Sequence, residues 1–282
     1  GAKGIIFITD DISDKSWVEV LPQMTRGTYG VEGLREKVDV GIPVFWIKQE
    51  NENWVKNNPE ISLNIQTETY KYPSVNIIGK IEGTDPQLKK EYVLLSGHQD
   101  HDGIRHPVKN DTIYNGADDD GSGTVAVMEI AEAFQQAKKS GKGPKRSILF
   151  LHVTGEEHGL LGSKYYSENP VFDLKNTVAN LNIDMIGRSD KENEGKNYVY
   201  VIGSDMLSTE LKKINVAANK ATQNLELNYK YDDPNDPMRL YYRSDHYNFA
   251  AKGVPVIFYF NGTHADYHKP TDRVEKINFD LM

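Results

Sequence analysis

The chain has 282 residues, enough for one large or two modest domains with a buried core. Its 33 Lys and Arg against 41 Asp and Glu give a net charge of -8, which disfavours binding to a phosphate backbone and argues against a nucleic-acid partner. No apolar run reaches the about 20 residues of a bilayer-spanning helix, and the absence of cysteine removes thiolate ligands and thiol nucleophiles. The chain begins at Gly1 without a signal-peptide pattern, so we expect a processed or trimmed N-terminus.

The first part of the chain is predicted to form a small β-rich or mixed domain without a catalytic constellation. Short strands are expected at 4–8 and 41–47, separated and followed by polar, turn-like segments. The segment 61–72 alternates apolar and polar residues loosely and ends before Pro73. We therefore expect one domain over residues 1–70 and a larger one over residues 71–282.

The larger domain has the pattern of an α/β fold. Apolar runs typical of buried strands occur at 75–78, 91–96, 148–153, 177–183, 198–202 and 254–260. Amphipathic helices are expected from Thr124 and from Leu207, with shorter ones at 159–168 and after Arg243. This alternation predicts a mixed, mostly parallel central sheet flanked by helices.

The predicted strands end in residues that can bind metals or transfer protons. The run 148–153 passes through a turn into Glu156 and Glu157, at the end of a strand where α/β proteins place their ligand crevice. A Glu-Glu pair alone would more simply be a solvated loop. However, His98 follows another strand, Asp184 follows a third, and His264 and His268 lie beyond the last strand.

Three consecutive aspartates, Asp118 to Asp120, precede the helix that is expected from Thr124. One carboxylate there would cap the helix and interact favourably with its dipole. Three carboxylates repel one another unless a cation neutralises them, so the triplet favours a metal site.

Four other histidines have simpler explanations. We expect His101 and His106 to be exposed in a polar loop, and His152, inside an apolar run, to be a core histidine with its hydrogen bonds satisfied. His158 is a ligand by type, but adjacent side chains rarely all face one ion.

Two imidazoles and three carboxylates exceed what one tetrahedral zinc needs. If one carboxylate bridges, the set divides between two ions, as in the two-metal sites of aminopeptidases and phosphatases. Glu156 is then a spare carboxylate beside a ligand, which suits a general base.

Five motifs in the larger domain, in order over about residues 72 to 282, resemble the co-catalytic zinc aminopeptidases of the family that contains aminopeptidase Y, bacterial secreted leucine aminopeptidases and glutamate carboxypeptidase II. They are Gly97-His98-Gln99-Asp100, Gly116-Ala117-Asp118-Asp119-Asp120-Gly121-Ser122-Gly123, Thr154-Gly155-Glu156-Glu157, Asn182-Ile183-Asp184-Met185 and Tyr267-His268-Lys269-Pro270-Thr271-Asp272. The resemblance implies a two-zinc peptidase that acts on peptides.

The resemblance also implies a role for each motif residue. His98 and Asp184 would bind one zinc, Glu157 and His268 the other, with Asp119 bridging and the Asp119-Asp120 peptide bond often cis. His268 is preferred to His264 because Asp272 follows it by four residues, as in the family pattern. Three further residues have implied roles: Glu156 as the base, Asp100 as the partner of His98, and Tyr267 as a contact for the oxyanion.

Several alternatives stay open. Carboxypeptidases and dipeptidases use the same metal core, a glutaminyl-cyclase-like enzyme shares the fold with one zinc, and a non-catalytic binding module would have lost ligands or the base.

The N-terminal part resembles the protease-associated (PA) insert that many members carry as a lid. The chain is expected to be a fragment, because it starts inside that insert and stops at Met282, where the family continues into a final helix. Members with the lid are usually secreted, periplasmic or on the cell surface, so we expect an extracytoplasmic location. The side-chain preference and the oligomeric state are left open.

Overall fold

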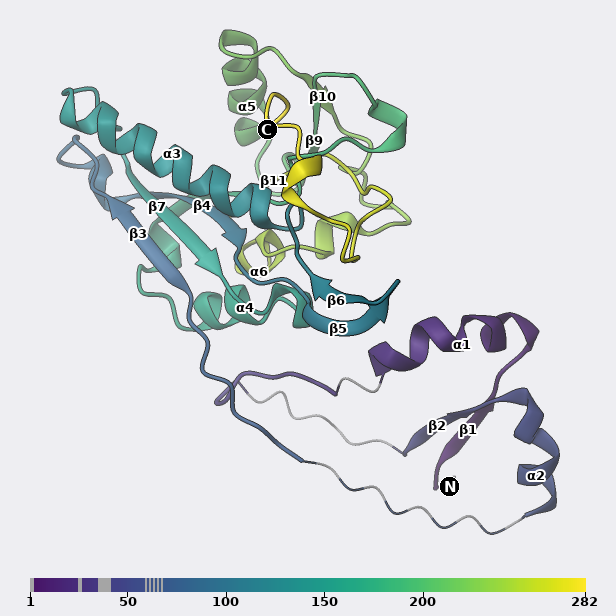
Figure 1. The fold of residues 1–282 in the computed structure, drawn as a ribbon. Coiled ribbons are helices and arrows are strands. Elements are labelled where there is room, and N and C mark those ends of the chain that lie inside the picture. Colours follow the sequence, from purple (N-terminus) through teal and green to yellow (C-terminus); the bar gives the residue numbers. More distant parts are fainter. Residues whose placement is uncertain are drawn as a thin grey trace. The chain divides into compact units, whose positions relative to one another are not determined.

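The computed structural model describes residues 3–24, 27–34, 42–58, 60, 62, 64, 66 and 68–282 (Figure 1). It divides into two compact units, Gly1–Pro73 and Ser74–Met282. In the first unit, β1 (Ile5–Ile8) pairs in parallel with β2 (Val44–Ile47), and α1 (Asp11–Met24) and α2 (Glu52–Asn57) are helical. The described part of this unit therefore contains helices as well as strands. Gly41, at the start of the second predicted strand, and several positions of the predicted segment 61–72 lie outside the described residues.

The second unit is built on one seven-stranded sheet with the order β10-β9-β11-β8-β4-β7-β3. Its strands are β3 (Ile77–Ile81), β4 (Tyr92–His98), β7 (Ser147–Val153), β8 (Thr177–Ile183), β9 (Tyr198–Ile202), β10 (Glu226–Asn228) and β11 (Val256–Phe260). The central strands β11, β8, β4 and β7 run parallel, whereas β9 and β3 are antiparallel to their central neighbours. The predicted mixed, mostly parallel sheet is confirmed.

Helices cover both faces of this sheet (Figure 1). They are α3 (Gly121–Lys139), α4 (Leu161–Glu168), α5 (Thr209–Ala221) and α6 (His246–Ala250). Alternate residues of β7 separate the faces: Leu149 and Leu151 pack in a cluster with Phe249 of α6, whereas Phe150 packs in a cluster with Val127 of α3. Burying each such side chain contributes about 1.5–3 kcal/mol, which explains why the central strands are rich in apolar residues.

The start of α3 lies against the end of β8. Asp120 is the N-cap of α3, and its Oδ1 accepts a hydrogen bond from the Gly123 N–H at 2.9 Å. A Cβ atom on Gly123 would lie 2.3 Å from the Ile183 carbonyl oxygen. Glycine at this position therefore lets the aspartate-rich turn approach the carboxyl end of the sheet.

A β-hairpin follows β4, where the sequence predicted only a polar loop. β5 (Gly103–Val108) pairs antiparallel with β6 (Asp111–Tyr114). The turn residues Lys109 and Asn110 have positive φ angles of 51° and 68°, as a two-residue hairpin turn requires. Among the described residues, no helix has the length and apolarity to cross a membrane.

Candidate metal centre

The side chains that the sequence singled out meet at the carboxyl edge of the sheet. His98 is the last residue of β4, Glu156 and Glu157 follow β7, Asp184 follows β8, and His268 lies beyond β11. Because these four strands are parallel and adjacent, their carboxyl ends lie side by side. The turn before α3 adds Asp118, Asp119 and Asp120.

Asp119 lies between the two histidines. Its Oδ1 is 3.2 Å from His98 Nε2, and its Oδ2 is 3.0 Å from His268 Nε2. The peptide bond between Asp119 and Asp120 is cis, as the family resemblance led us to expect. Each carboxylate oxygen thus faces a different imidazole, which is the arrangement expected of a residue that bridges two cations.

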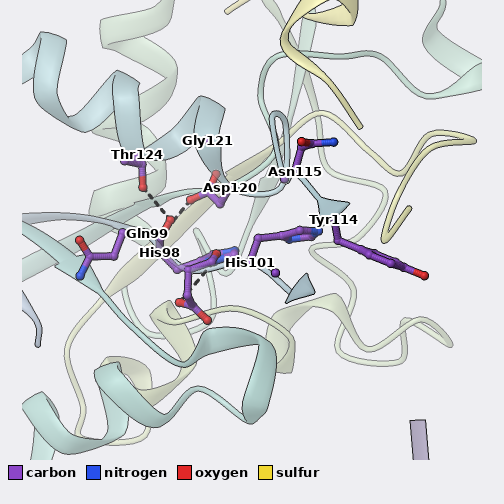
Figure 2. Close-up of a pocket in the computed structure, with 11 residues that line it drawn as sticks. His98, Gln99, His101, Tyr114, Asn115, Asp120, Gly121 and Thr124 are labelled. Atoms are coloured by element: carbon purple, nitrogen blue, oxygen red, sulfur yellow. Dashed lines mark hydrogen bonds and ion pairs between the residues drawn. The ribbon is translucent and has the colours of Figure 1, made fainter. Parts of the chain in front are cut away.

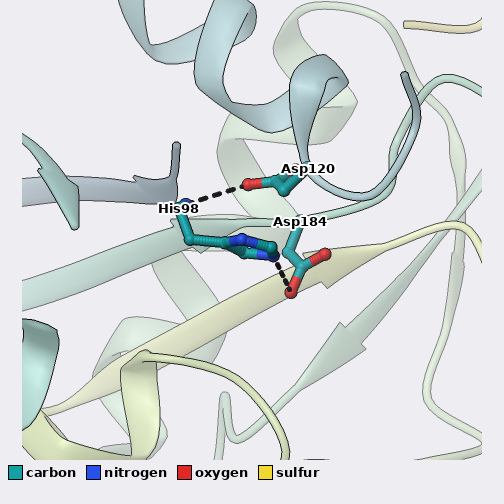
Figure 3. Close-up of side chains that lie close together, drawn as sticks. All are labelled: His98, Asp120 and Asp184. Carbon is teal, nitrogen blue, oxygen red and sulfur yellow. Dashed lines mark hydrogen bonds and ion pairs between the residues drawn. The ribbon is translucent and has the colours of Figure 1, made fainter. Parts of the chain in front are cut away.

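Each histidine also faces a second carboxylate. His98 Nε2 is 3.8 Å from Asp184 Oδ2 (Figure 3), and His268 Nε2 is 3.2 Å from Glu157 Oε2. The structure therefore brings together the five residues predicted to be ligands as two adjoining groups that share Asp119. Their role as ligands stays a prediction.

Asp120 also lies near His98 and Asp184, but its oxygens are occupied by the backbone (Figure 3). Its Oδ2 accepts a hydrogen bond from the His98 N–H at 3.1 Å, and its Oδ1 accepts from the Met185 N–H at 3.2 Å. Asp119 is therefore the member of the triplet that points into the cluster.

His264 faces a different carboxylate from His268. Its Nε2 is 3.1 Å from Asp118 Oδ2, and the other oxygen of Asp118 accepts a hydrogen bond from the Gly187 N–H at 2.7 Å. Only His268 of this pair has a recorded contact with Asp119 and Glu157 among the described residues. This geometry agrees with the preference for His268.

Asp272 holds the aspartate turn in place. Its fully buried carboxylate accepts hydrogen bonds from the N–H of Asp118 at 3.0 Å and of Asp119 at 3.2 Å. The sequence used Asp272 only as a spacing marker, because a contact across more than 150 residues leaves no local signal.

Asp100 contacts His98 through its backbone rather than through its side chain. His98 Nδ1 is 2.9 Å from the Asp100 carbonyl oxygen and 3.8 Å from the carboxylate. The carboxylate instead accepts hydrogen bonds from the N–H groups of Glu156 and Glu157, at 3.2 and 3.4 Å. It thus orients the turn that carries both glutamates, a role that the motif alone did not reveal.

Glu156 and Tyr267 line a hollow that Asp119 and Asp184 also border. Glu156 Oε2 is 3.9 Å from His98 Nε2. Burial raises the pKa of Glu156 well above its ordinary value, although the charge of His98 acts in the opposite direction. Burial likewise raises the pKa of Tyr267, whose ring lies 4.0 Å from that of His268 between centroids. Both residues thus lie where a substrate could reach them.

The charges of the cluster compensate one another in the absence of a cation. Burial raises the pKa of Glu157, but contacts with His101 and His268 outweigh it and bring the pKa to about 2. Burial lowers the pKa of His268, but the opposite effect of Asp119 and Glu157 is larger and raises the pKa to about 10. For Asp184 burial dominates and raises the pKa to about 7. Cations bound here would therefore take the place of protons.

Three histidines, His101, His152 and His106, differ from their predictions. His101, expected to be exposed, has a side chain only 7% exposed, and its Nδ1 is 2.7 Å from Glu157 Oε1. Its ring shares a hollow of about 320 Å³ with His98 (Figure 2). His152, expected to be a satisfied core histidine, is only half-buried, and its Nδ1 has no hydrogen-bond partner in the described part of the chain.

His106, which was also expected to be exposed, is half-buried, with Nε2 at 3.2 Å from the Tyr114 hydroxyl. His158 does not belong to any of the close groups of potential ligands among the described residues.

The donor set fits zinc. Within the described ranges, three buried atoms of the cluster lack a hydrogen-bond partner, namely His98 Nε2, Asp119 Oδ2 and Glu157 Oε1. Buried polar atoms are normally paired, so unpaired ones indicate a missing partner. Imidazole nitrogens and carboxylate oxygens without sulfur are suitable zinc ligands.

The sheet topology and this cluster together define the class of zinc-exopeptidase folds. Residues 76–282 match Peptidase family M28, and the chain therefore belongs to this family. A probable leucine aminopeptidase from Arthroderma otae is 26% identical over 250 residues, which cover 86% of this chain and 63% of that protein. A probable glutamate carboxypeptidase from Arthroderma benhamiae is 37% identical over 123 residues, 43% of this chain and 15% of that protein.

A solved structure gives the same picture. The zinc aminopeptidase BSAP from Bacillus subtilis is 26% identical, with a TM-score of 0.52 over 73% of this chain and 46% of that chain. This chain spans about three fifths of the length of the leucine aminopeptidases that it matches.

Proposed function

We propose that this chain is the catalytic part of a metallo-exopeptidase that removes N-terminal amino acids from peptides with two zinc ions. The observation that carries the proposal is the position of Asp119, whose two oxygens face His98 and His268 at 3.2 and 3.0 Å. A single zinc site needs no carboxylate between two imidazoles. The leucine aminopeptidases and the zinc aminopeptidase among its relatives support the choice of reaction.

In this proposal His98 and Asp184 hold one ion, Glu157 and His268 hold the other, and Asp119 contacts both. Two zinc ions held there would activate water and stabilise negative charge on the scissile carbonyl oxygen. Asp272 and Asp100 hold the two ligand-bearing turns in position, because their carboxylates accept hydrogen bonds from the backbone of these turns.

Glu156 is the proposed general base. It would accept a proton from the attacking water and return it to the leaving amine. Its raised pKa disfavours the ionised form in the metal-free chain. A cation within about 4–6 Å lowers the pKa of a carboxyl group, so the base becomes competent once the cluster is loaded. Tyr267, in the same hollow, is placed to donate a hydrogen bond to the developing oxyanion.

The hollow also suggests where the substrate side chain lies. Besides the charged residues, it is lined by the apolar side chains of Met185, Leu240, Phe258 and Phe260. These residues would suit an apolar side chain.

Carboxypeptidase or dipeptidase activity with the same metal core is the second candidate, supported by the glutamate carboxypeptidase relative. The presence of all five proposed ligands and of Glu156 favours an enzyme over a non-catalytic binding module. A one-zinc cyclase is disfavoured because His98 is present and faces Asp119.

The test combines metal content with hydrolysis. Purified protein would be assayed for zinc and for cleavage of aminoacyl-nitroanilides and of dipeptides, before and after chelation and with Glu156→Gln. We expect about two zinc ions per chain, and a loss of activity of about 10²–10⁴-fold in the variant with zinc retained. One ion and no amide hydrolysis would support the cyclase, and no metal at all would support the binding module.

Two further proposals rest on the family resemblance alone. We infer that residues 1–70 are part of a lid of the PA type and that the protein works outside the cytoplasm. Fractionation of the source cells that finds the protein in the cytoplasm would contradict the second.

A further inference from the structure

We propose that His101 is an additional zinc ligand, which joins Glu157, His268 and Asp119 around the second ion. This inference rests on the proposed two-zinc function. It differs from the motif-based assignment, which gives that ion only Glu157, His268 and the shared Asp119. The second position would then have four protein ligands instead of three.

The two oxygens of Glu157 face two different imidazoles. Oε2 is 3.2 Å from His268 Nε2, and Oε1 is 2.7 Å from His101 Nδ1. Asp119 Oδ2 is 3.0 Å from His268 Nε2 and 3.9 Å from His101 Nδ1. His101 Nδ1, Asp119 and Glu157 thus form one close group that can hold a metal ion, and Glu157 also belongs to a neighbouring group with His268 and Asp102.

The His101 ring is buried against the carboxylate of Glu157. Its side chain is 7% exposed, and its Nδ1 lies 2.7 Å from Glu157 Oε1. The other ring nitrogen, Nε2, has no hydrogen-bond partner among the described residues. A buried imidazole and a buried carboxylate that face each other this closely can share a cation.

The surrounding chain fixes the position of this ring. Gly116 has a positive φ of 63°, and a Cβ atom there would lie 2.4 Å from Cγ of His101. The ring of His101 also packs edge-on against that of His268, with centroids 5.5 Å apart. The aspartate-rich turn therefore leaves room for this imidazole and holds it beside the second ion.

An extra ligand would make the two positions unequal. The position of His98 and Asp184, with Asp119 shared, has three protein ligands and so keeps a coordination site open, as catalytic zinc does. The position of His101 and His268 would have four protein ligands and would take water as a fifth ligand, so both ions could still act on water. The second ion is then expected to bind more tightly and to exchange more slowly.

The experiment compares the wild-type protein with His101→Ala, His101→Asn and the control His106→Ala. His106 lies in β5, in the hairpin that follows His101, and contacts Tyr114 rather than the cluster. Zinc affinity at each position would be measured by competition with a chromophoric chelator, and the number of imidazoles per zinc by X-ray absorption spectroscopy. Circular dichroism would verify the fold of each variant.

We expect His101→Ala to lower the affinity for one of the two zinc ions by more than about 100-fold. This is more than the usual effect of replacing a residue that only orients a ligand. The imidazole count should fall from three to two for each pair of ions, and His106→Ala should change neither value. His101→Asn should behave like His101→Ala, because an amide can hydrogen-bond Glu157 but is a poor zinc ligand.

Three outcomes would overturn the inference: an unchanged affinity, an unchanged imidazole count, or rescue by His101→Asn, which would mean that His101 only orients Glu157. A wild-type protein that binds no zinc would instead refute the proposed function. If His101→Ala does not fold, His101→Asn still decides between ligand and orienting residue.

Discussion

Replacing Ser244 with alanine should weaken both the fold and one zinc position. The Ser244 hydroxyl donates a hydrogen bond to Asp184 Oδ2 at 2.7 Å and accepts one from Asn182 Nδ2 at 2.9 Å. The chain of contacts continues from Asn182 to Ser96 at 2.6 Å and from Ser96 to Asn180 at 2.8 Å. All five side chains are buried, so water cannot replace the missing hydroxyl.

The magnitude follows from the two broken hydrogen bonds. Each buried partner left unsatisfied costs about 1–3 kcal/mol, and we expect a total of about 3 kcal/mol. In a unit of this size each kcal/mol lowers Tm by about 2–4 °C, so the melting temperature should fall by about 6–12 °C. Because Asp184 also loses its orientation, zinc affinity at the His98 position should fall by about 10–100-fold.

Thermal melts of the metal-free protein and chelator competition with zinc would measure both effects. Ser147→Ala is the matched control, because Ser147 is equally buried at the other end of β7. Its hydroxyl accepts a hydrogen bond from the Gly83 N–H and donates one to the Lys89 carbonyl oxygen. Both variants should lose stability, and only Ser244→Ala should lose zinc affinity. Equal zinc affinities in the two variants would refute the reasoning.

Two further outcomes are expected. The metal-free protein should lose thermal stability as the pH rises from about 5 to 10. Burial raises the pKa of Asp184 from 3.8 to about 7. Burial lowers the pKa of His268, but the neighbouring carboxylates of Asp119 and Glu157 have the larger effect and raise it from 6.5 to about 10. Each group contributes stability that is fully present below its pKa in the unfolded chain and is lost as the pH rises through its pKa in the folded chain. A melting temperature that stays constant over this range would contradict these pKa shifts. Arg243→Ala should raise KM about 10-fold for dipeptides, whose carboxylate can reach this basic side chain of the hollow, and leave aminoacyl-nitroanilides unchanged. An equal effect on both substrates would show that Arg243 acts instead through the Tyr267 hydroxyl, which lies 3.5 Å from its Nη2.

The sequence predicted the central strands because each is rich in apolar residues and is bounded by polar or turn-forming segments. It also predicted which polar residues gather, because parallel strands end at one edge of the sheet. β8, for example, was expected at 177–183 and is observed there.

What the sequence did not predict depends on contacts between distant segments. His101 follows a strand in a polar stretch, which indicates exposure, but Gly116, Glu157 and His268 from distant parts of the chain lie against its ring. The carboxylate of Asp272 contacts a turn more than 150 residues away. The β5–β6 hairpin had a local signal, the Lys109-Asn110 turn, but Pro107 and the polar residues around it obscured the alternation of the strands.

The position of β11 makes a complete metal site depend on closure of the sheet. β11 is the last strand in the sequence, yet it lies inside the sheet between β8 and β9. The Asp184 N–H donates a hydrogen bond to the Tyr259 carbonyl oxygen of β11 at 3.2 Å, and His268 follows the same strand. A partly folded chain in which β11 has not joined the sheet would therefore have neither of the two proposed zinc positions complete. Uptake of zinc would report that β11 is in place, and a chain in which this strand fails to pair would be recognisable by its failure to retain metal.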